Sequence, residues 1–225
     1  MDRTWLHNPV LTSASGLPQA LWETIYMASV TMVFTVLVGL PLGMLLHATS
    51  KGGLVPIRWL STVLGAVVNI GRSLPFIILM IALIPFTRLL VSQSVGSTAA
   101  IVPLTIGAIP FFARLVEINL REVDSGKVEA AAMMGASRSH LMGRVLLPEA
   151  LPGIIGSVTT TAITVISYTA MAGAVGGGGL GAMAIQYGYN RFMADVMIVT
   201  VVLLVVMVQI VQVVGDILAR AVDHR

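Results

Sequence analysis

The chain alternates between long apolar segments and short polar connections, and the apolar segments are long enough to cross a lipid bilayer. A membrane-spanning helix needs about 20 mostly apolar residues. The segments that reach this length are 20–47, 57–87, 97–122, 151–175 and 194–219. Lipid offers the backbone no hydrogen-bonding partner, so each span must be helical. The pattern predicts an all-α integral membrane protein with five transmembrane helices.

Composition agrees with this reading of the pattern. Of the 225 residues, 56% are hydrophobic and only 10% are charged, whereas a soluble domain carries about 25% charged residues. We therefore expect residues 1–225 to form a single transmembrane domain. The absence of cysteine excludes disulfides, iron–sulfur clusters and thiolate metal sites. The histidines are scattered and no HExxH motif occurs, so we expect neither a metal site nor catalytic residues.

The distribution of basic residues predicts the orientation, since cytoplasmic segments of membrane proteins are enriched in Lys and Arg. With the N-terminus outside, Arg3, Arg88 and Arg191 lie outside. The cytoplasmic segments then carry Lys51, Arg58, Arg114, Arg121, Lys127, Arg138, Arg144, Arg220 and Arg225. This excess predicts an external N-terminus, a cytoplasmic C-terminus and a cytoplasmic loop between spans three and four. The net charge of +3 then reflects topology and gives no reason to expect nucleic-acid binding.

That cytoplasmic loop, 125–148, differs from the rest of the chain because it is polar yet helix-like. Ser125 can cap a first short helix. Gly135 can adopt the backbone conformation that turns the chain. Ser137 can cap a second short helix that Pro148 ends. One face of the first helix is made mostly of small side chains, at Val128, Ala131, Ala132 and Gly135.

The spacing within the loop resembles a known family. Glu129-Ala130-Ala131 is followed after three residues by Gly135, and after nine more by Val145, one further residue and Leu147-Pro148. This resembles the "EAA" loop of permease subunits of bacterial ABC importers, with Val145 where the family favours Ile. The resemblance implies a coupling helix that docks on a cytoplasmic ATPase. The residues it assigns to this role are Glu129, Ala130, Ala131, Met134, Gly135, Arg138, Leu147 and Pro148.

Other segments resemble the methionine-importer branch of these permeases. They are RSLPFIIL (72–79), IPFTR (84–88), AAIVPLTIGAIPFFARLVE (99–117) and AMAGAVGGGGLGAMAIQYGYNRF (170–192). The resemblance implies a homodimeric permease in the bacterial inner membrane, two cytoplasmic ABC ATPase subunits and an external substrate-binding lipoprotein. The chain has no GxxxxGK[ST] loop, so we expect ATP and Mg²⁺ on the partner ATPase and no cofactor on this chain.

A few residues within the spans are candidates for the translocation path. Arg72 lies about 22 Å from Ile57 at 1.5 Å per residue, and intramembrane charges are functional candidates. It either ties together a helix broken at Pro75 or contacts a substrate carboxylate. Met171 either gates the path or only packs between helices. The further polar candidates are Tyr168 and Asn69.

Two glycine patterns predict close packing. Gly39 and Gly43 have the spacing at which membrane helices approach each other closely. The glycines at 176–179 and 181 predict an external turn or a close helix contact, in preference to a phosphate-binding loop.

The function that we expect is that of the membrane permease subunit of an ATP-driven amino-acid importer, with methionine as the expected substrate, working by alternating access. Three alternatives stay open. The same architecture can carry another small nutrient, and a channel or scaffold subunit would need no ATPase. An intramembrane enzyme ranks last, because no catalytic constellation is present in the sequence.

Overall fold

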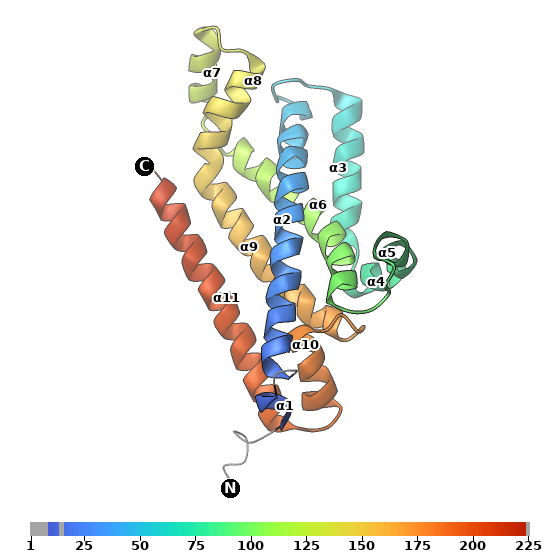
Figure 1. Ribbon diagram of the computed structural model, residues 1–225. Coiled ribbons are helices and arrows are strands. Elements are labelled where there is room, and N and C mark those ends of the chain that lie inside the picture. Colours follow the sequence, from blue (N-terminus) through green and yellow to red (C-terminus); the bar gives the residue numbers. More distant parts are fainter. Residues whose placement is uncertain (1–8, 14–15, 224–225) are drawn as a thin grey trace. The chain divides into compact units, whose positions relative to one another are not determined.

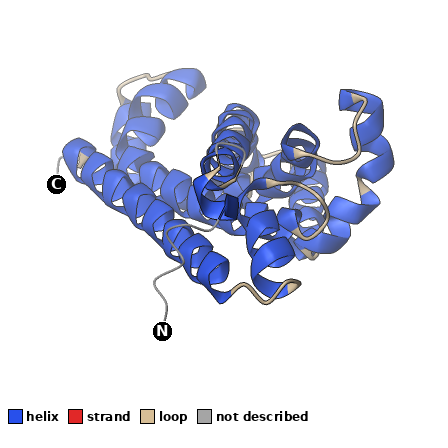
Figure 2. Ribbon diagram, turned by 60° about the horizontal axis from the view of Figure 1, so that its bottom comes forward, coloured by secondary structure: helices blue, strands red, loops and turns tan. Residues whose placement is uncertain are grey.

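The computed structural model describes residues 9–13 and 16–223, and every regular element in those ranges is a helix (Figures 1 and 2). Arg3, His7, His224 and Arg225 lie outside them. The elements are α1 (Pro9–Thr12), α2 (Leu17–Thr49), α3 (Arg58–Ser73), α4 (Phe76–Ala82), α5 (Ile84–Val91), α6 (Ser97–Arg121), α7 (Ser125–Met133), α8 (Arg138–His140), the π-helical η2 (Leu141–Leu146), α9 (Leu147–Gly173), α10 (Gly179–Met183), the π-helical η3 (Ala184–Tyr189) and α11 (Ala194–Val222).

Four stretches are long and apolar enough to cross a membrane, and they lie where the sequence pattern predicts spans one, three, four and five. They are Leu17–Thr49, Ser97–Arg121, Arg138–Gly173 and Ala194–Val222. The expected second span, 57–87, is not one continuous helix. It is broken between α3 and α4, and the count of spans reaches five if this bent pair is one span.

Pro75 explains the break. Leu74 has extended backbone, with φ −78° and ψ 126°, which is the conformation that a following proline imposes. Pro75 lacks an N–H and serves as the N-cap of α4. A second proline, Pro85, lies at the start of α5, where its missing N–H costs nothing. The break that the sequence analysis places at Pro75 is therefore present between α3 and α4.

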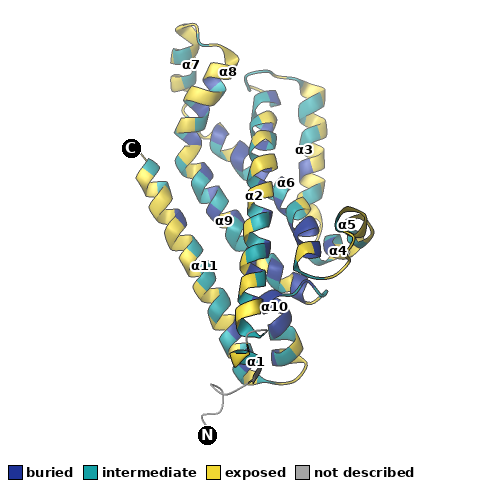
Figure 3. Ribbon diagram, viewed as in Figure 1, coloured by how far each residue is buried: buried dark blue, intermediate teal, exposed yellow. Residues whose placement is uncertain are grey.

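The chain divides into two compact units, and each is described by itself. Unit one contains the described part of Met1–Val33 together with Pro75–Ile106 and Ala162–Val211. One of its cores gathers Met27 of α2, Phe76 and Met80 of α4, and Leu104 of α6. Another forms around Leu180 and Val196. All five residues of α10 are buried (Figure 3).

Unit two contains Phe34–Leu74, Gly107–Thr161 and the described part of Gln212–Arg225. Its main core is built from α6, η2 and α9, around Phe112, Val116 and Leu146. A Cβ on Gly39 would lie 2.8 Å from Phe112 Cδ1, and one on Gly43 would lie 2.6 Å from the Ala113 carbonyl oxygen. The prediction of close helix packing at these two glycines is therefore confirmed, and α6 is the helix they meet.

The apolar residues of α11 lie largely on its surface (Figure 3). Val201, Ile210 and Ile217 are 47%, 58% and 61% exposed. In water, exposure of these apolar side chains would be unfavourable. In lipid it carries no such cost, because the lipid tails are as apolar as the side chains. The exposure of α11 is therefore that of a helix built for a membrane.

Candidate functional site

The predicted coupling loop begins with α7, a short helix in which no residue is buried. Its N-cap is Asp124, whose carboxylate accepts a hydrogen bond of 2.7 Å from the Gly126 N–H. The prediction that Ser125 caps this helix is wrong, because Ser125 is already its first residue. An aspartate at the N-cap satisfies an open N–H and also favours the helix dipole.

The end of α7 leaves two large apolar side chains in the open. Met133 is 90% exposed and Met134 is 83% exposed. Both lie at the end of α7, between the long apolar helices α6 and α9. Adjacent apolar side chains exposed to this degree are typical of a surface that another protein covers.

Gly135 turns the chain after α7, as the sequence predicts. Its φ is +84°, a value that residues with a Cβ rarely adopt. Its N–H bonds to the Ala132 carbonyl at 3.0 Å. A Cβ at this position would meet nothing within 4 Å. Backbone conformation alone therefore requires the glycine, and the surrounding space is empty.

The second short helix begins as predicted but does not end where predicted. Ser137 caps α8 by accepting a hydrogen bond from the His140 N–H. The prediction that Pro148 ends the helix is wrong, since helical structure continues from Arg138 to Gly173. The intervening η2 is π-helical, and the Leu147 N–H bonds five residues back to the Met142 carbonyl. This wider turn gives room to a proline ring that would clash in a regular α-helix.

Most of the residues assigned to ATPase coupling are accessible. Ala131 and Leu147 are half-buried, and Leu147 packs against the main core of unit two. The exposed members are Glu129, Ala130, Met134, Gly135, Arg138 and Pro148. The structure thus gathers the assigned residues of α7 and its turn on one open segment, while Leu147 connects that segment to the core.

An ion pair holds the loop, and a cavity lined by charged residues flanks it. Lys127 of α7 forms an ion pair with Glu149 of α9, with 2.6 Å between Nζ and Oε2. Glu129 lines a cavity of about 320 Å³ in unit two. Lys51 and Arg121 line the same cavity, so the carboxylate that the family resemblance emphasises lies among basic side chains.

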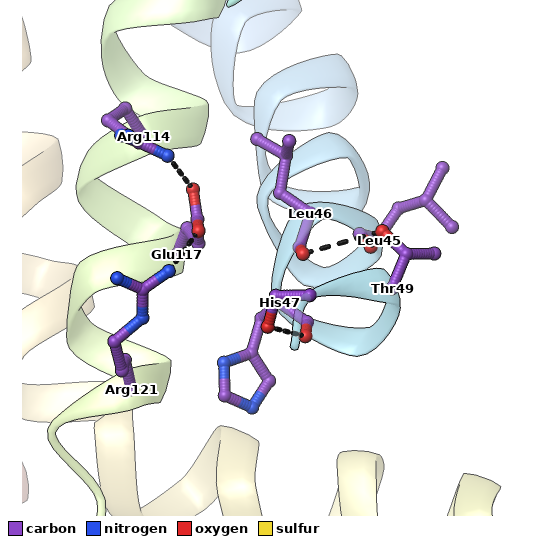
Figure 4. A network of polar contacts seen from close by, with 8 residues as sticks. Leu45, Leu46, His47, Thr49, Arg114, Glu117 and Arg121 are labelled. Carbon is purple, nitrogen blue, oxygen red and sulfur yellow. Dashed lines mark hydrogen bonds and ion pairs between the residues drawn. The ribbon is translucent and has the colours of Figure 1, made fainter. Parts of the chain in front are cut away.

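A buried charge cluster on α6 was missed at the level of the sequence (Figure 4). Glu117 is 4% exposed and pairs with Arg114 at 2.6 Å and with Arg121 at 2.5 Å. Arg121 also reaches the cavity lined by Glu129. The signal was present, because positions 114, 117 and 121 share one face of a helix. Both ion pairs lie within α6, where the two guanidinium groups balance the buried carboxylate.

The four translocation-path candidates fall in different units. On α3, Asn69 and Arg72 are both exposed, and Arg72 occupies the last turn, where the helix dipole favours a cation. On α9, Tyr168 stacks on Phe76 with ring centroids 4.4 Å apart, and Met171 is 39% exposed. The stacking gives Tyr168 a packing role in the core of unit one.

The glycine-rich segment after α9 is a tightly packed turn, which confirms the prediction of a turn or close contact. Gly176, Gly178 and Gly179 all have positive φ. Two adjacent residues of α2 hold the end of the turn. The Glu23 carboxylate accepts a hydrogen bond of 2.7 Å from the Gly179 N–H, and the Thr24 hydroxyl accepts one of 2.9 Å from the Leu180 N–H.

An open cavity of about 510 Å³ lies beside this turn in unit one. Its walls come from the segment before α2, the first turns of α2, the glycine turn, α10 and η3. Glu23 is among the residues that line it. Sequence reasoning did not find this cavity, because its walls are contributed by segments more than 150 residues apart.

Apolar helices of membrane-spanning length, joined by an exposed loop, are typical of an integral membrane protein. Within the residues that the structure describes, no group of three His, Asp or Glu side chains could hold a metal ion. The sequence profile of the family "Binding-protein-dependent transport system inner membrane component" matches residues 39–225. The chain belongs to this family, and the predicted resemblance to importer permeases is confirmed.

Several relatives are similar over nearly their whole length. The probable D-methionine transport system permease protein MetI of Vibrio cholerae is 57% identical over 206 residues, 92% of either chain. The methionine import system permease protein MetP of Bacillus subtilis is 47% identical over 92% of this chain and 93% of its own. Among solved structures, an inward-facing MetNI methionine ABC transporter matches with a TM-score of 0.91 and 48% identity, over 92% of this chain and 96% of that chain.

Proposed function

We propose that this chain is the permease subunit of an ATP-driven methionine importer in the bacterial inner membrane. The similar proteins named as methionine permeases in Vibrio cholerae and Bacillus subtilis support methionine as the substrate. The similarity to MetNI supports an ABC transporter, with ATP and Mg²⁺ bound by a separate ATPase. In this proposal residues 1–225 form one transmembrane permease domain.

The permease works as a homodimer with two cytoplasmic ATPase subunits and an external substrate-binding lipoprotein. Each copy spans the membrane five times, with the α3–α4 pair counted as one broken span. Its N-terminus is external and its C-terminus cytoplasmic, because nine basic residues then face the cytoplasm against three outside. The loop 125–148 is thereby cytoplasmic, on the side where ATP is available.

The exposed methionines of the loop carry the proposal that it docks on the ATPase. Met133 and Met134 are 90% and 83% exposed in a segment that the topology leaves in water. Flexible methionine side chains adapt readily to a partner surface. Glu129, Ala130, Ala131 and Gly135 supply the charge, the close approach and the turn. Arg138, Leu147 and Pro148 continue the surface toward α9.

Transport then proceeds by alternating access. ATP binding brings the two ATPase subunits together, and the docked loops move with them, so that the two permease copies open to the outside. Hydrolysis restores the inward-facing state. Lys127–Glu149 and the Leu147 contact connect the moving loop to α9. On that helix Met171 is the candidate gate, and Tyr168, Asn69 and Arg72 are further candidates for the translocation path, each within its own unit.

The test is a detergent pull-down from cell membranes in which the tagged chain captures a cytoplasmic ABC ATPase, followed by ATPase and methionine-uptake assays. Gly135→Asp adds a charge to the open turn and should abolish capture and uptake while the chain still inserts. Gly96→Asp is the matched control, because Gly96 also has positive φ and nothing within 4 Å of its Cβ position. It lies outside the coupling loop and should leave capture unchanged.

Capture of the ATPase by both variants would refute docking through the loop. Recovery of the wild-type chain alone, stable and intact, would favour the channel or scaffold alternative. Capture without methionine uptake would retain the importer and move the proposal to another small nutrient, which single-nutrient growth tests would identify.

A further inference from the structure

The cavity beside the glycine turn is lined by the carboxylate of Glu23, whose hydrogen-bond donors among the described residues are neutral. Glu23 is half-buried. Its oxygens accept hydrogen bonds from the Gly179 N–H at 2.7 Å and from Gln19 Nε2 at 3.0 Å. Both donors are neutral. A half-buried carboxylate held by neutral donors favours a site that takes a cationic group from elsewhere.

The rest of the lining is divided between polar and apolar side chains. Ser13, Gln19 and Gln186 add hydroxyl and amide groups next to Glu23, and Ala20, Ala182 and Met183 supply apolar surface. The volume of about 510 Å³ is within the range of about 300–1,000 Å³ that is usual for small-molecule sites. Such a lining suits a small ligand with an ammonium group at one end and an apolar side chain at the other.

We propose that this cavity is an entry site for the amino acid on the external face of the permease, in which Glu23 binds the α-ammonium group. This inference rests on the proposed function, which supplies both the amino-acid class and the external location of α1 and the start of α2. The amides of Gln19 and Gln186 and the hydroxyl of Ser13 can donate to the substrate carboxylate. The apolar wall formed by Ala182 and Met183 receives the thioether side chain.

The glycine turn ties this site to the rest of unit one. Gly179, whose N–H bonds to Glu23, opens α10, and Thr24 holds the next residue of α10 through its hydroxyl. An ammonium group on Glu23 adds a charge-assisted bond to a carboxylate that the turn already orients. The site is therefore assembled before the ligand arrives, and binding requires no rearrangement of the turn.

Equilibrium dialysis tests the proposal with the full chain and its ATPase in lipid nanodiscs, without the binding protein. The probes are methionine, its decarboxylated amine and its deaminated acid. The amine and methionine should bind, and the acid should not. Glu23→Gln keeps an acceptor for the Gly179 N–H and removes the charge, so it should weaken binding of the amine about tenfold or more. Asp216→Asn makes the same chemical change on α11 and should have no effect.

Equal amine affinity in wild type and Glu23→Gln would overturn the proposal, as would binding of the acid as tight as that of the amine. If Glu23→Gln does not fold, the comparison of amine with acid on the wild-type protein still tests whether the site requires an ammonium group. Methionine uptake with the binding protein and ATP is measured in parallel. Uptake without Glu23-dependent binding refutes only the entry site, whereas Glu23-dependent amine binding without methionine uptake refutes only the proposed substrate.

Discussion

Two turns of this chain depend on glycine in a left-handed conformation, and their surroundings are opposite. Gly135 has φ +84°, and a Cβ there would meet nothing within 4 Å. Gly179 has φ +75°, and its Cβ would lie 2.6 Å from Thr24 Oγ1 and 2.9 Å from Met27 Cε. The first turn follows a helix with no buried residue, and the second begins a helix in which every residue is buried.

The difference separates a turn built for contact with a partner from a turn built for rigidity. The open turn leaves its apolar side chains accessible to a partner. In return, few interactions hold it against the rest of its own chain. The packed turn gains two hydrogen bonds from α2 and a close fit that excludes any side chain larger than glycine. Segments with few buried contacts open locally with less free energy than segments in the core. We therefore expect the same substitution to have very different consequences in the two turns.

The largest effect is expected for alanine in the packed turn. Gly179→Ala combines a strained positive φ, which costs about 1–3 kcal/mol, with overpacking, which costs about 1–3 kcal/mol more. The free energy of unfolding should fall by roughly 2–6 kcal/mol. Gly135→Ala meets only the backbone strain and should lose about 1 kcal/mol. Thermal unfolding of both variants in the same detergent measures the difference.

Equal destabilisation by the two alanines would show that packing around Gly179 adds nothing to its backbone requirement. The contrast between the turns would then be one of exposure only. A loss confined to Gly135→Ala would reverse the comparison.

A smaller effect is expected from the hydroxyl that holds the packed turn. Thr24 is 1% exposed, and its Oγ1 accepts from the Leu180 N–H and donates to the Ala20 carbonyl. Thr24→Val keeps the shape but leaves the Leu180 N–H without its acceptor, which costs about 1–3 kcal/mol. Thr62→Val is the control, because the exposed Thr62 hydroxyl bonds only to its own helix. It should change stability by less than about 0.5 kcal/mol. Equal losses in chemical denaturation would contradict a structural role for the Thr24 hydroxyl.

The sequence was a good guide to features that depend on local pattern. Four spans follow directly from apolar length, and the turn at Gly135 and the cap at Ser137 follow from the properties of single residues. The expected break at Pro75 is present, whereas the helix end expected at Pro148 is wrong. Both prolines were visible, but whether proline breaks a helix depends on its surroundings. Leu74 becomes extended before Pro75, while the π-helical η2 accommodates Pro148.

Contacts between distant segments could not be predicted in the same way. Glu23 and Gly179 are 156 residues apart, and nothing in either segment names the other. The Arg114–Glu117–Arg121 cluster is different, since its spacing along α6 was readable and only its burial was hidden. A carboxylate between two arginines on one helix face is therefore a signal that sequence analysis can use.

The smallest effect concerns the ion pair that tethers the open loop. Lys127 and Glu149 are 50% and 35% exposed, so their pair contributes at most about 1 kcal/mol after screening by solvent. Lys127→Ala should barely change global stability. Yet α7 has no buried residue and rests on the half-buried Val128, so this pair is a large share of what holds it. Amide hydrogen exchange in α7 should become about twofold to fivefold faster, while exchange in α10 stays unchanged.

Lys51→Ala is the control, because Lys51 lines the neighbouring cavity and its Nζ does not pair with Glu149. Unchanged exchange in α7 would mean that Val128 alone holds the helix. The open loop would then be anchored by packing, as the packed turn at Gly179 is.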